Sequence, residues 1–348
     1  MKIAGREIGA GQPPYCIAEA SCNHLGSLDE AKTLIRAAKI SGADAIKFQA
    51  YTADTITLDC DSPDFIVKEG PWKGRRLYEL YTVAQTPFEW FPALFEEAKR
   101  HGITALASVF DRTSIDLLEK LDCPAYKIAS MEITDIPLIK YAAKTGKPLI
   151  ISTGMASMQE IHDAIPGFMK VDDLAFLHCI SGYPTRFEEA NLRRIHEIYL
   201  SRSLWHDPHI GISDHTLGWE VPVAATALGA TIIEKHFIMS RFCGSEDAAF
   251  SLEPDEFAEM CMKVRQIWRA MQPGETKSEE SSRQLRRSLY VVADMSAGEV
   301  FTEQNVRSIR PSYGLPPKNL PYILGQRAIK DIKRGTALSW SLVEPQSS

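Results

Sequence analysis

Eight short apolar segments recur along the chain, and each is followed by a stretch with helical features. They read "YCIAEA" (15–20), "AIKFQA" (45–50), "TALASV" (104–109), "AYKIAS" (125–130), "LIISTG" (149–154), "LAFLHC" (174–179), "HIGISD" (209–214) and "TIIEKH" (231–236). Near-continuous apolar runs are typical of strands buried on both faces of a parallel sheet. Eight strand–helix units over about 270 residues predict a TIM (β/α)8 barrel. A doubly wound open sheet is the alternative, but no GxGxxG follows the first run.

The segments between these runs carry helix-start signals. Capping-box spacing occurs in three pairs, Ser27 with Glu30, Thr86 with Glu89 and Ser157 with Glu160, and Pro87 stands where a first helical residue would. Residues 51–86 are longer than a barrel connection needs. Their aromatic "GPWKGRRLYELY" predicts a functional lid or subsite.

The composition changes after a predicted helix at 254–271. We predict a barrel domain over 1–271, a polar linker over 272–283, "QPGETKSEESSR", and a small module over 284–348. In the module, "RSLYVVADMSAGEVF" and "DIKRGTALSW" resemble short strands with glycine turns. So small a module is marginally stable alone, so we expect it to dock on a barrel, its own or a partner's.

The charge and cysteine usage exclude several classes of protein. The 348 residues are 45% hydrophobic and 24% charged with a formal net charge of −6, which argues against a nucleic-acid partner. No apolar stretch is long enough for a signal peptide or a membrane span, so we expect no membrane partner and a cytoplasmic location. The seven cysteines contain no CxxC pair and are predicted to be reduced.

Polar side chains gather where the predicted strands end, and in a TIM barrel those ends form the active-site rim. They are Glu19 with Asn23, Lys47 with Gln49, Ser108, Lys127 with Ser130, Ser152, Ser213 with His215, and His236. Any one of them is equally well explained as a loop cap or a satisfied core group. Their joint placement at one rim favours a functional site.

Two histidines end consecutive strands and should be neighbours. His215 and His236 could hold a divalent metal that acts as a Lewis acid on a carbonyl, with Asp247 as a direct or water-mediated ligand. The alternative is a pair of hydrogen-bonding histidines and a solvated acid.

Lys47 and Gln49 lie two positions apart on one predicted strand, so their side chains point to the same side. With Lys127 and the hydroxyls of Ser130, Ser152 and Ser213, Lys47 would form a nest for a phosphate or carboxylate. The alternatives are an ion pair between Lys47 and Glu19, or a lysine that forms a Schiff base. Lys235 does not suit that chemistry, because it is adjacent to His236 on the same strand and its side chain therefore points to the opposite face.

These stretches together resemble the sialic acid synthase family, and within it most closely the pseudaminic acid branch. The matching motifs include "AEASCNHLG", "IKFQAYTADTITLD", "PAYKIASMEITDIPLIKYAAKTGKPLIISTGMAS", "HCISGYP", "GISDHTLG", "IEKHF" and "DAAFSLEPDEF", in one order along almost the whole chain. The last 65 residues, with "RSLYVV" and "VRSIRPSYGLPP", resemble the family's SAF, or antifreeze-like, domain.

The resemblance implies a reaction and a role for each residue. Phosphoenolpyruvate would condense with an N-acylated amino sugar, 2,4-diacetamido-2,4,6-trideoxy-L-altrose, to give a nine-carbon 2-keto acid and phosphate. His215 and His236 would bind Mn(II) or Mg(II), which Asp247 would complete. Phosphoenolpyruvate would contact Lys47, Ser108, Lys127, Ser130, Ser152 and Ser213, and the substrates would also contact Asn23 and Ser181. Glu19, Gln49 and Tyr183 would lie near the sugar and the attacking water, with Glu19 moving protons. Arg310 would reach into the partner's barrel in a domain-swapped homodimer.

The chain departs from the family pattern beside Asp247. The usual Gly-Pro-Asp is replaced by "GSED" (244–247), which retains Asp247, loses a rigid proline and gains Glu246. Ile180 and Arg186 are further departures near the sugar. The alternatives that stay open are a neuraminate or legionaminate synthase, a Schiff-base aldolase that uses Lys127, and a non-catalytic sugar-binding protein.

Overall fold

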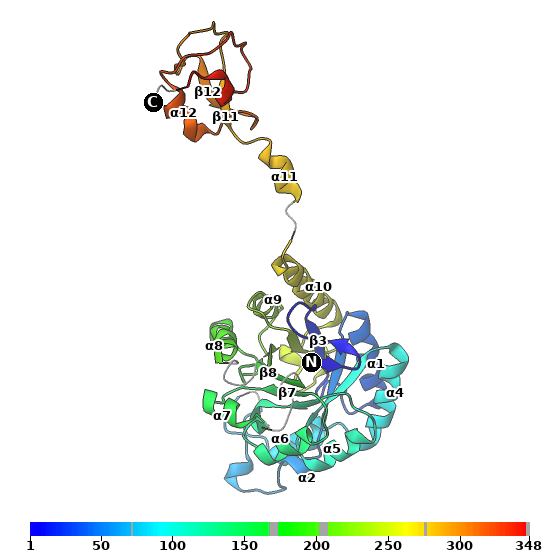
Figure 1. The fold of residues 1–348 in the computed structure, drawn as a ribbon. Helices are drawn as coiled ribbons and strands as arrows, with labels where there is room; N and C mark the ends of the chain where they lie inside the picture. Colours follow the sequence, from blue (N-terminus) through cyan, green and yellow to red (C-terminus); the bar gives the residue numbers. More distant parts are fainter. Residues whose placement is uncertain (71, 166, 168–172, 202–207, 275–276, 346–348) are drawn as a thin grey trace. The chain divides into compact units, whose positions relative to one another are not determined.

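Eight parallel strands close into a barrel whose order follows the predicted runs (Figure 1). The computed structural model describes the whole chain except residues 71, 166, 168–172, 202–207, 275–276 and 346–348. The barrel strands are β3 (Tyr15–Glu19), β4 (Ala45–Ala50), β5 (Thr104–Val109), β6 (Tyr126–Ile128), β7 (Leu149–Ser152), β8 (Leu174–His178), β9 (His209–Asp214) and β10 (Ile232–His236). The predicted TIM barrel is therefore confirmed.

Helices surround the barrel, as Figure 1 shows. They are α1 (Leu28–Ile40), α2 (Ala53–Ile56), α3 (Leu77–Ala84), α4 (Phe91–His101), α5 (Arg112–Glu119), α6 (Ile136–Ala143), α7 (Met158–Asp163), α8 (Arg193–Ser201), α9 (Glu220–Ala227) and α10 (Pro254–Met271). Apolar residues fill two regions. One core packs the strands against the helices, and a second fills the barrel interior, where the hairpin of β1 (Lys2–Ile3) and β2 (Arg6–Glu7) contributes Ile3.

Two of the three predicted capping pairs are present. The side chain of Ser27 accepts a hydrogen bond from the Glu30 amide, and Ser157 with Glu160 forms a reciprocal capping box. The prediction at Thr86 is wrong. Thr86 is buried beside His24, Pro87 precedes a 3-10 turn at Phe88–Trp90, and α4 begins only at Phe91. A hydrogen bond to a distant ring thus replaces the local cap.

The barrel unit spans Met1–Gln272, and a second compact unit spans Pro273–Ser348. The predicted linker contains a short helix, α11 (Lys277–Arg283). The second unit pairs β11 (Ser288–Val291) with β12 (Val306–Ile309) antiparallel and includes α12 (Leu320–Ile323) around its own apolar core. The expected strand in "DIKRGTALSW" is reduced to isolated bridges, such as Tyr290 with Ala337.

All seven cysteines are free, as predicted, and five of them are buried. Among the helices in the described residues, none has the length and apolarity needed to cross a membrane.

His24 is a buried histidine that makes folding sensitive to acid. Its Nδ1 accepts a hydrogen bond from the Gly26 amide at 3.1 Å, its Nε2 lies 3.1 Å from the Thr86 hydroxyl, and the ring packs edge-on against Trp90. Burial lowers the pKa of His24 from 6.5 to about 4. The neutral ring therefore fits the folded state, while the unfolded chain binds a proton first as the pH falls.

We therefore expect the free energy of unfolding to fall as the pH drops from 6.5 to about 4. The loss from this one ring is on the order of 3 kcal/mol. Urea unfolding at several pH values should show a shallower decline for His24→Gln than for the wild type. Equal slopes for the two proteins would contradict the assignment.

Candidate active site

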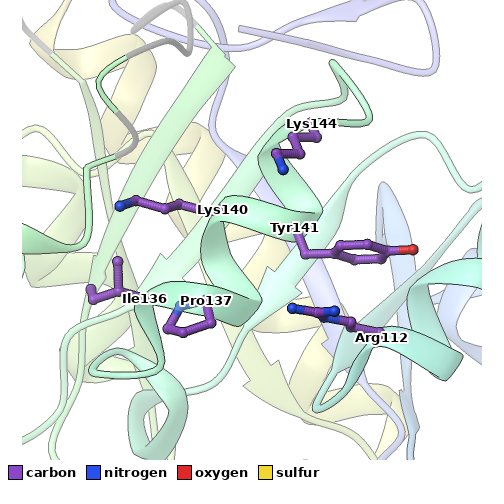
Figure 2. Close-up of a pocket in the computed structure, with 6 residues that line it drawn as sticks. All are labelled: Arg112, Ile136, Pro137, Lys140, Tyr141 and Lys144. Atoms are coloured by element: carbon purple, nitrogen blue, oxygen red, sulfur yellow. The ribbon is translucent and has the colours of Figure 1, made fainter.

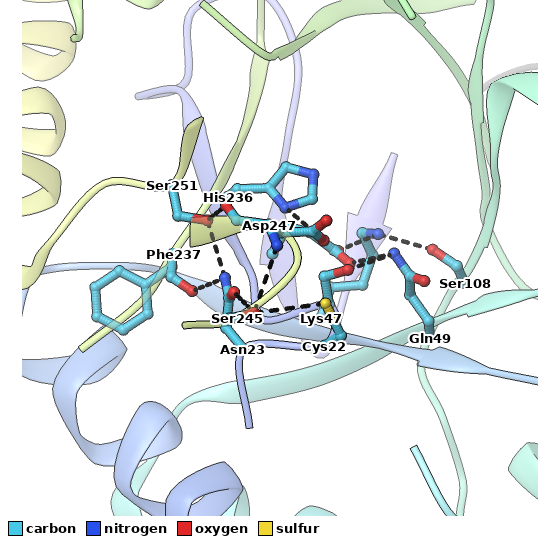
Figure 3. Close-up of polar contacts among 12 residues, drawn as sticks. Cys22, Asn23, Lys47, Gln49, Ser108, His236, Phe237, Ser245, Asp247 and Ser251 are labelled. Atoms are coloured by element: carbon cyan, nitrogen blue, oxygen red, sulfur yellow. Dashed lines mark hydrogen bonds and ion pairs between the residues drawn. The ribbon is translucent and has the colours of Figure 1, made fainter. Parts of the chain in front are cut away.

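The strand register brings the predicted residues together at one end of the barrel. Glu19 is paired with Lys47 and with His236, Ser108 with Gln49 and with Lys127, and Ser213 with Glu234. Partner residues on neighbouring parallel strands point to the same side of the sheet, so these side chains all face the barrel interior near its carboxyl end. Figure 3 shows Lys47, Gln49, Ser108 and His236 around this space.

Lys47 is neutralised by carboxylates of the chain itself. Its ammonium group forms an ion pair with Glu19, lies 3.7 Å from Glu234, and donates to the Ser108 hydroxyl at 2.7 Å. Burial alone would lower the pKa of Lys47, but Glu19 and Glu234 outweigh it and raise this pKa. The ion pair between Lys47 and Glu19, one of the three interpretations given above, is therefore present in this structure. Gln49 donates to Glu19 at 3.0 Å and to Ser21 at 3.0 Å.

Lys127 is the buried cation without a carboxylate partner. Among the described residues no acid lies within ion-pair distance of its ammonium group, which donates to the Ser152 hydroxyl at 2.6 Å and to the Ile128 carbonyl at 2.9 Å. Burial lowers the pKa of Lys127. An anion bound here would offset the cost of burying this charge.

Two further hydroxyls lie close to each other next to this lysine's strand. The Ser130 and Ser181 hydroxyls are 3.0 Å apart. They approach because Gly154 follows β7 with a φ of +46°, and a Cβ there would lie 2.5 Å from the Ser130 Cβ. A side chain at Gly154 would displace Ser130, so this glycine shapes the polar end of the site.

His215 and His236 lie side by side, with ring centroids 5.4 Å apart. The Nδ1 of His215 lies 2.8 Å from the Ile180 carbonyl, which fixes the proton on that nitrogen and leaves Nε2 with a lone pair that can bind a metal. The Nδ1 of His236 is buried and has no hydrogen-bond partner in the described structure, and it lies 3.6 Å from Asp247 Oδ2. Burial lowers the pKa of both histidines, so both rings are neutral at pH 7.

This donor set fits a divalent cation. Neutral imidazoles with a carboxylate suit a first-row divalent metal, and the unpartnered Nδ1 of His236 is the kind of buried polar atom that a ligand would satisfy. The described residues contain no converged group of three His, Cys, Asp or Glu ligands. The two rings are therefore the direct candidates, and Asp247 is a direct or water-mediated one.

Asn23 anchors the loop that carries Asp247. Its amide nitrogen donates to the Phe237 carbonyl and to the Ser251 hydroxyl, both at 2.9 Å, and its oxygen accepts from Ser245 at 2.6 Å (Figure 3). Ser251 in turn donates to the Asp247 carbonyl at 2.7 Å. These contacts give Asn23 a structural role in holding the loop, and its predicted contact to substrate stays a prediction.

Tyr183 covers the histidine pair with an aromatic ring. Its centroid lies 4.4 Å from that of His215 and 5.3 Å from that of Phe250. Phe250 also packs on His236, at 4.8 Å. The aromatic rings exclude water from one side of the metal-binding candidates, which strengthens electrostatic interactions there.

Two acids of the site escaped prediction, the buried Glu234 and the half-buried Glu132. Glu234 lies two positions before His236 on β10, so alternation places both in the barrel, and it accepts from Ser213 at 3.0 Å. Glu132 lies in the 3-10 turn Ser130–Glu132. Its Oε2 is buried without a hydrogen-bond partner in the described structure, and burial, against the effect of Lys127, raises its pKa to about 7. The alternation of side chains along β10 could have revealed Glu234. Nothing in the sequence indicates that the Oε2 atom of Glu132 is buried.

Other polar groups lie outside this site. Lys235 is buried and forms an ion pair with Asp214, away from His236 as its parity predicts. Arg310 directly follows β12 in the second unit and is exposed.

A cavity of about 480 Å³ lies between α5 and α6, as Figure 2 shows. It is lined by Arg112, Ile136, Pro137, Lys140, Tyr141 and Lys144, and none of these is a predicted site residue.

The barrel, its polar rim and the appended unit define the class of protein. Residues 34–276 match the NeuB family and residues 286–344 match the SAF domain. The chain belongs to the NeuB family, and its class is that of the sialic and nonulosonic acid synthases, enzymes that form a carbon–carbon bond.

Named relatives match over nearly the whole chain. The pseudaminic acid synthase of Campylobacter jejuni subsp. jejuni serotype O:23/36 (strain 81-176) is 46% identical, over 94% of this chain and 96% of its own length. The pseudaminic acid synthase of Helicobacter pylori is 41% identical, over 96% of this chain and 98% of its own length. The crystal structure of the N-acetylneuraminic acid synthetase from Leptospira borgpetersenii is 30% identical with a TM-score of 0.71, and the match covers 82% of this chain and 95% of that one.

Proposed function

We propose that this chain condenses phosphoenolpyruvate with 2,4-diacetamido-2,4,6-trideoxy-L-altrose to give pseudaminic acid and phosphate. One observation carries the proposal. The neutral His215–His236 pair with Asp247 and the unpaired cation Lys127 with its hydroxyls lie at one rim of the same barrel. The reaction needs these two environments together, one for an aldehyde oxygen and one for a phosphate and a carboxylate.

The histidine side of the rim suits the sugar aldehyde. A bound divalent cation, Mn(II) or Mg(II), supplies Lewis acidity that polarises a carbonyl oxygen. His215 and His236 would hold it, with Asp247 beside them. The carbonyl of Ile180 orients His215, and the Asn23 network orients the Asp247 loop. The "GSED" departure therefore leaves Asp247 next to His236.

The lysine side suits phosphoenolpyruvate. Lys127 would pair with an anionic group, and Ser130, Ser152 and Ser181 would donate to its oxygens. Lys47, Ser108 and Ser213 line the same interior and would exchange their present contacts for the substrate. This arrangement directs carbon 3 of the enol pyruvate toward the aldehyde. A new carbon–carbon bond forms there, water adds at carbon 2, and phosphate leaves.

Proton transfer to or from that water requires an acid with a pKa near neutrality. Burial outweighs the effect of Lys47 and raises the pKa of Glu19 as well, but the Glu19 carboxylate already contacts Lys47 and Gln49. Glu132 has a free buried oxygen and a pKa raised to about 7. We therefore propose that Glu132 moves the proton, with Glu19 holding Lys47 and the water in place.

Glu132→Gln is expected to lower kcat by about a hundredfold, because the amide keeps the shape and loses the titrating proton. The KM for phosphoenolpyruvate should stay close to the wild-type value, and the limb of the pH–rate profile near pH 7 should disappear. Glu119→Gln, a matched change on α5 that removes an ion pair with Lys147, should keep the wild-type profile. An unchanged profile in Glu132→Gln would assign the proton transfer elsewhere.

The function is tested by phosphate release. The purified protein is incubated with phosphoenolpyruvate, Mn(II) and either the diacetamido sugar or N-acetylmannosamine. Release with the first sugar and formation of a nine-carbon keto acid support the proposal. Release with N-acetylmannosamine alone would move the chain to the neuraminate branch.

A Schiff-base aldolase is the second candidate, because burial lowers the pKa of Lys127 and so favours its nucleophilic form. Borohydride reduction in the presence of substrate would trap a covalent adduct on Lys127 if this chemistry operates. Activity that a chelator removes and Mn(II) restores would count against it.

A further inference from the structure

Two segments far apart in the sequence meet above the histidine pair. One is a hairpin in the loop after β4, where Ile66 and Arg76 form an antiparallel bridge and the Gly74 amide donates to the Val67 carbonyl at 2.8 Å. The other is the loop after β10, which carries Asp247. Both lie at the carboxyl end of the barrel, where loops shape the substrate pocket.

The hairpin contacts the site at two points. Trp72 packs against Tyr183, with ring centroids 5.9 Å apart, and Tyr183 covers His215. The Arg75 guanidinium forms an ion pair with Glu246, the residue next to Asp247. Their side chains are 36% and 27% exposed, so the pair is partly shielded from water.

Ser245 and Glu246 hold the Asp247 loop from different sides. The Ser245 hydroxyl bonds to Asn23 in the loop after β3, whereas Glu246 bonds to Arg75 in the loop after β4. On the lysine side of the rim, Lys127 on β6 bonds to Ser152 on β7 and to the Ile128 carbonyl, and among the described residues no hydrogen bond or ion pair joins Lys127 or Ser152 to this hairpin. The ion pair therefore joins the hairpin to one half of the site.

We propose that Arg75 and Glu246 are positioning residues that fix the Trp72 hairpin as the wall of the sugar half of the site. The inference rests on the proposed function for the identity of the sugar. The pair then governs binding of the amino sugar, while phosphoenolpyruvate binds the lysine half independently of it.

The adjacent Arg76 provides a matched control. It forms ion pairs with Asp59, Asp61 and Glu79, all within the same long loop, and none with the barrel rim among the described contacts. Arg75→Met and Arg76→Met therefore remove the same side-chain charge at neighbouring positions of one hairpin. Only the first breaks a contact with the Asp247 loop.

We expect Arg75→Met and Glu246→Gln each to raise the KM for the sugar by about fivefold and to change the KM for phosphoenolpyruvate by less than about twofold. Arg75→Lys, which keeps the charge, should recover most of the loss, and so should the exchanged pair Arg75→Glu with Glu246→Arg. A rise in both KM values, or the same rise in Arg76→Met, would overturn the proposal.

Hydrogen exchange tests the contact without any substrate. Arg75→Met should speed exchange in both the 66–76 and the 244–252 peptides, and Arg76→Met should leave the 244–252 peptide unchanged. If the wild type releases no phosphate with either sugar, the proposed function fails, while this exchange pattern still decides whether the pair joins the two loops. Unchanged exchange in the 244–252 peptide of Arg75→Met would refute the link itself.

Discussion

Replacing His236 with alanine is expected to reduce the rate of phosphate release by about a thousandfold, because a Lewis acid contributes several kcal/mol at the reacting oxygen. Mn(II) binding measured by calorimetry should weaken by at least about a hundredfold. The fold should persist. The Nδ1 of His236 has no hydrogen-bond partner in the described structure, so the change leaves no buried group newly unpaired.

The neighbouring strand offers a control for this experiment. His178 is buried at the end of β8, and its Nε2 lies 2.8 Å from the Ala190 carbonyl, outside the histidine pair. His178→Ala should lower the melting temperature and leave the affinity for Mn(II) unchanged. His215→Ala should behave like His236→Ala. Wild-type rates in both of those variants would show that the pair does not hold a metal.

Removal of residues 284–348 is expected to abolish activity with the barrel still folded, because it removes Arg310, to which the family resemblance assigns a contact with the site. The single change Arg310→Ala should lower kcat/KM by about 10- to 100-fold, the usual effect of losing a hydrogen bond to a charged group. Arg307→Ala, on the same strand β12, is the matched control and should keep the wild-type rate.

Mixed subunits test the domain-swapped homodimer that the family resemblance implies. Co-expression of His236→Ala and Arg310→Ala chains would create, in each mixed dimer, one site with an intact barrel and an intact arginine from the other chain. Random pairing should restore about a quarter of the wild-type rate. If Arg310 served its own barrel, every site in the mixture would stay defective and no activity would return.

Local sequence patterns predicted the barrel because each pattern reflects a physical requirement that neighbouring residues satisfy. Strands buried on both faces must be apolar along their length, and all eight runs became barrel strands in chain order. Strand alternation likewise placed Lys235 away from His236. The same rule would have found Glu234, two residues before His236.

Patterns failed where a distant partner replaced the local one. Thr86 has capping spacing, yet its hydroxyl faces the buried ring of His24, and the helix begins later. Local patterns also did not indicate that the Asn23 amide bonds to Phe237, Ser245 and Ser251, more than 200 positions away. Each partner was visible in the sequence, but its proximity was not.

The sequence by itself determined the alternating strands and helices, the ends at which polar residues gather, and the family. The spacing of residues along a strand is enough to predict which side chains face the barrel interior, since successive side chains alternate between the two faces. Only the tertiary structure decided which of the buried lysines are paired with a carboxylate. Glu19 and Glu234 neutralise Lys47, Lys127 has no acid beside it, and Glu132 keeps a free buried oxygen. Burial and pairing depend on residues from different strands, so they arise only when the barrel closes.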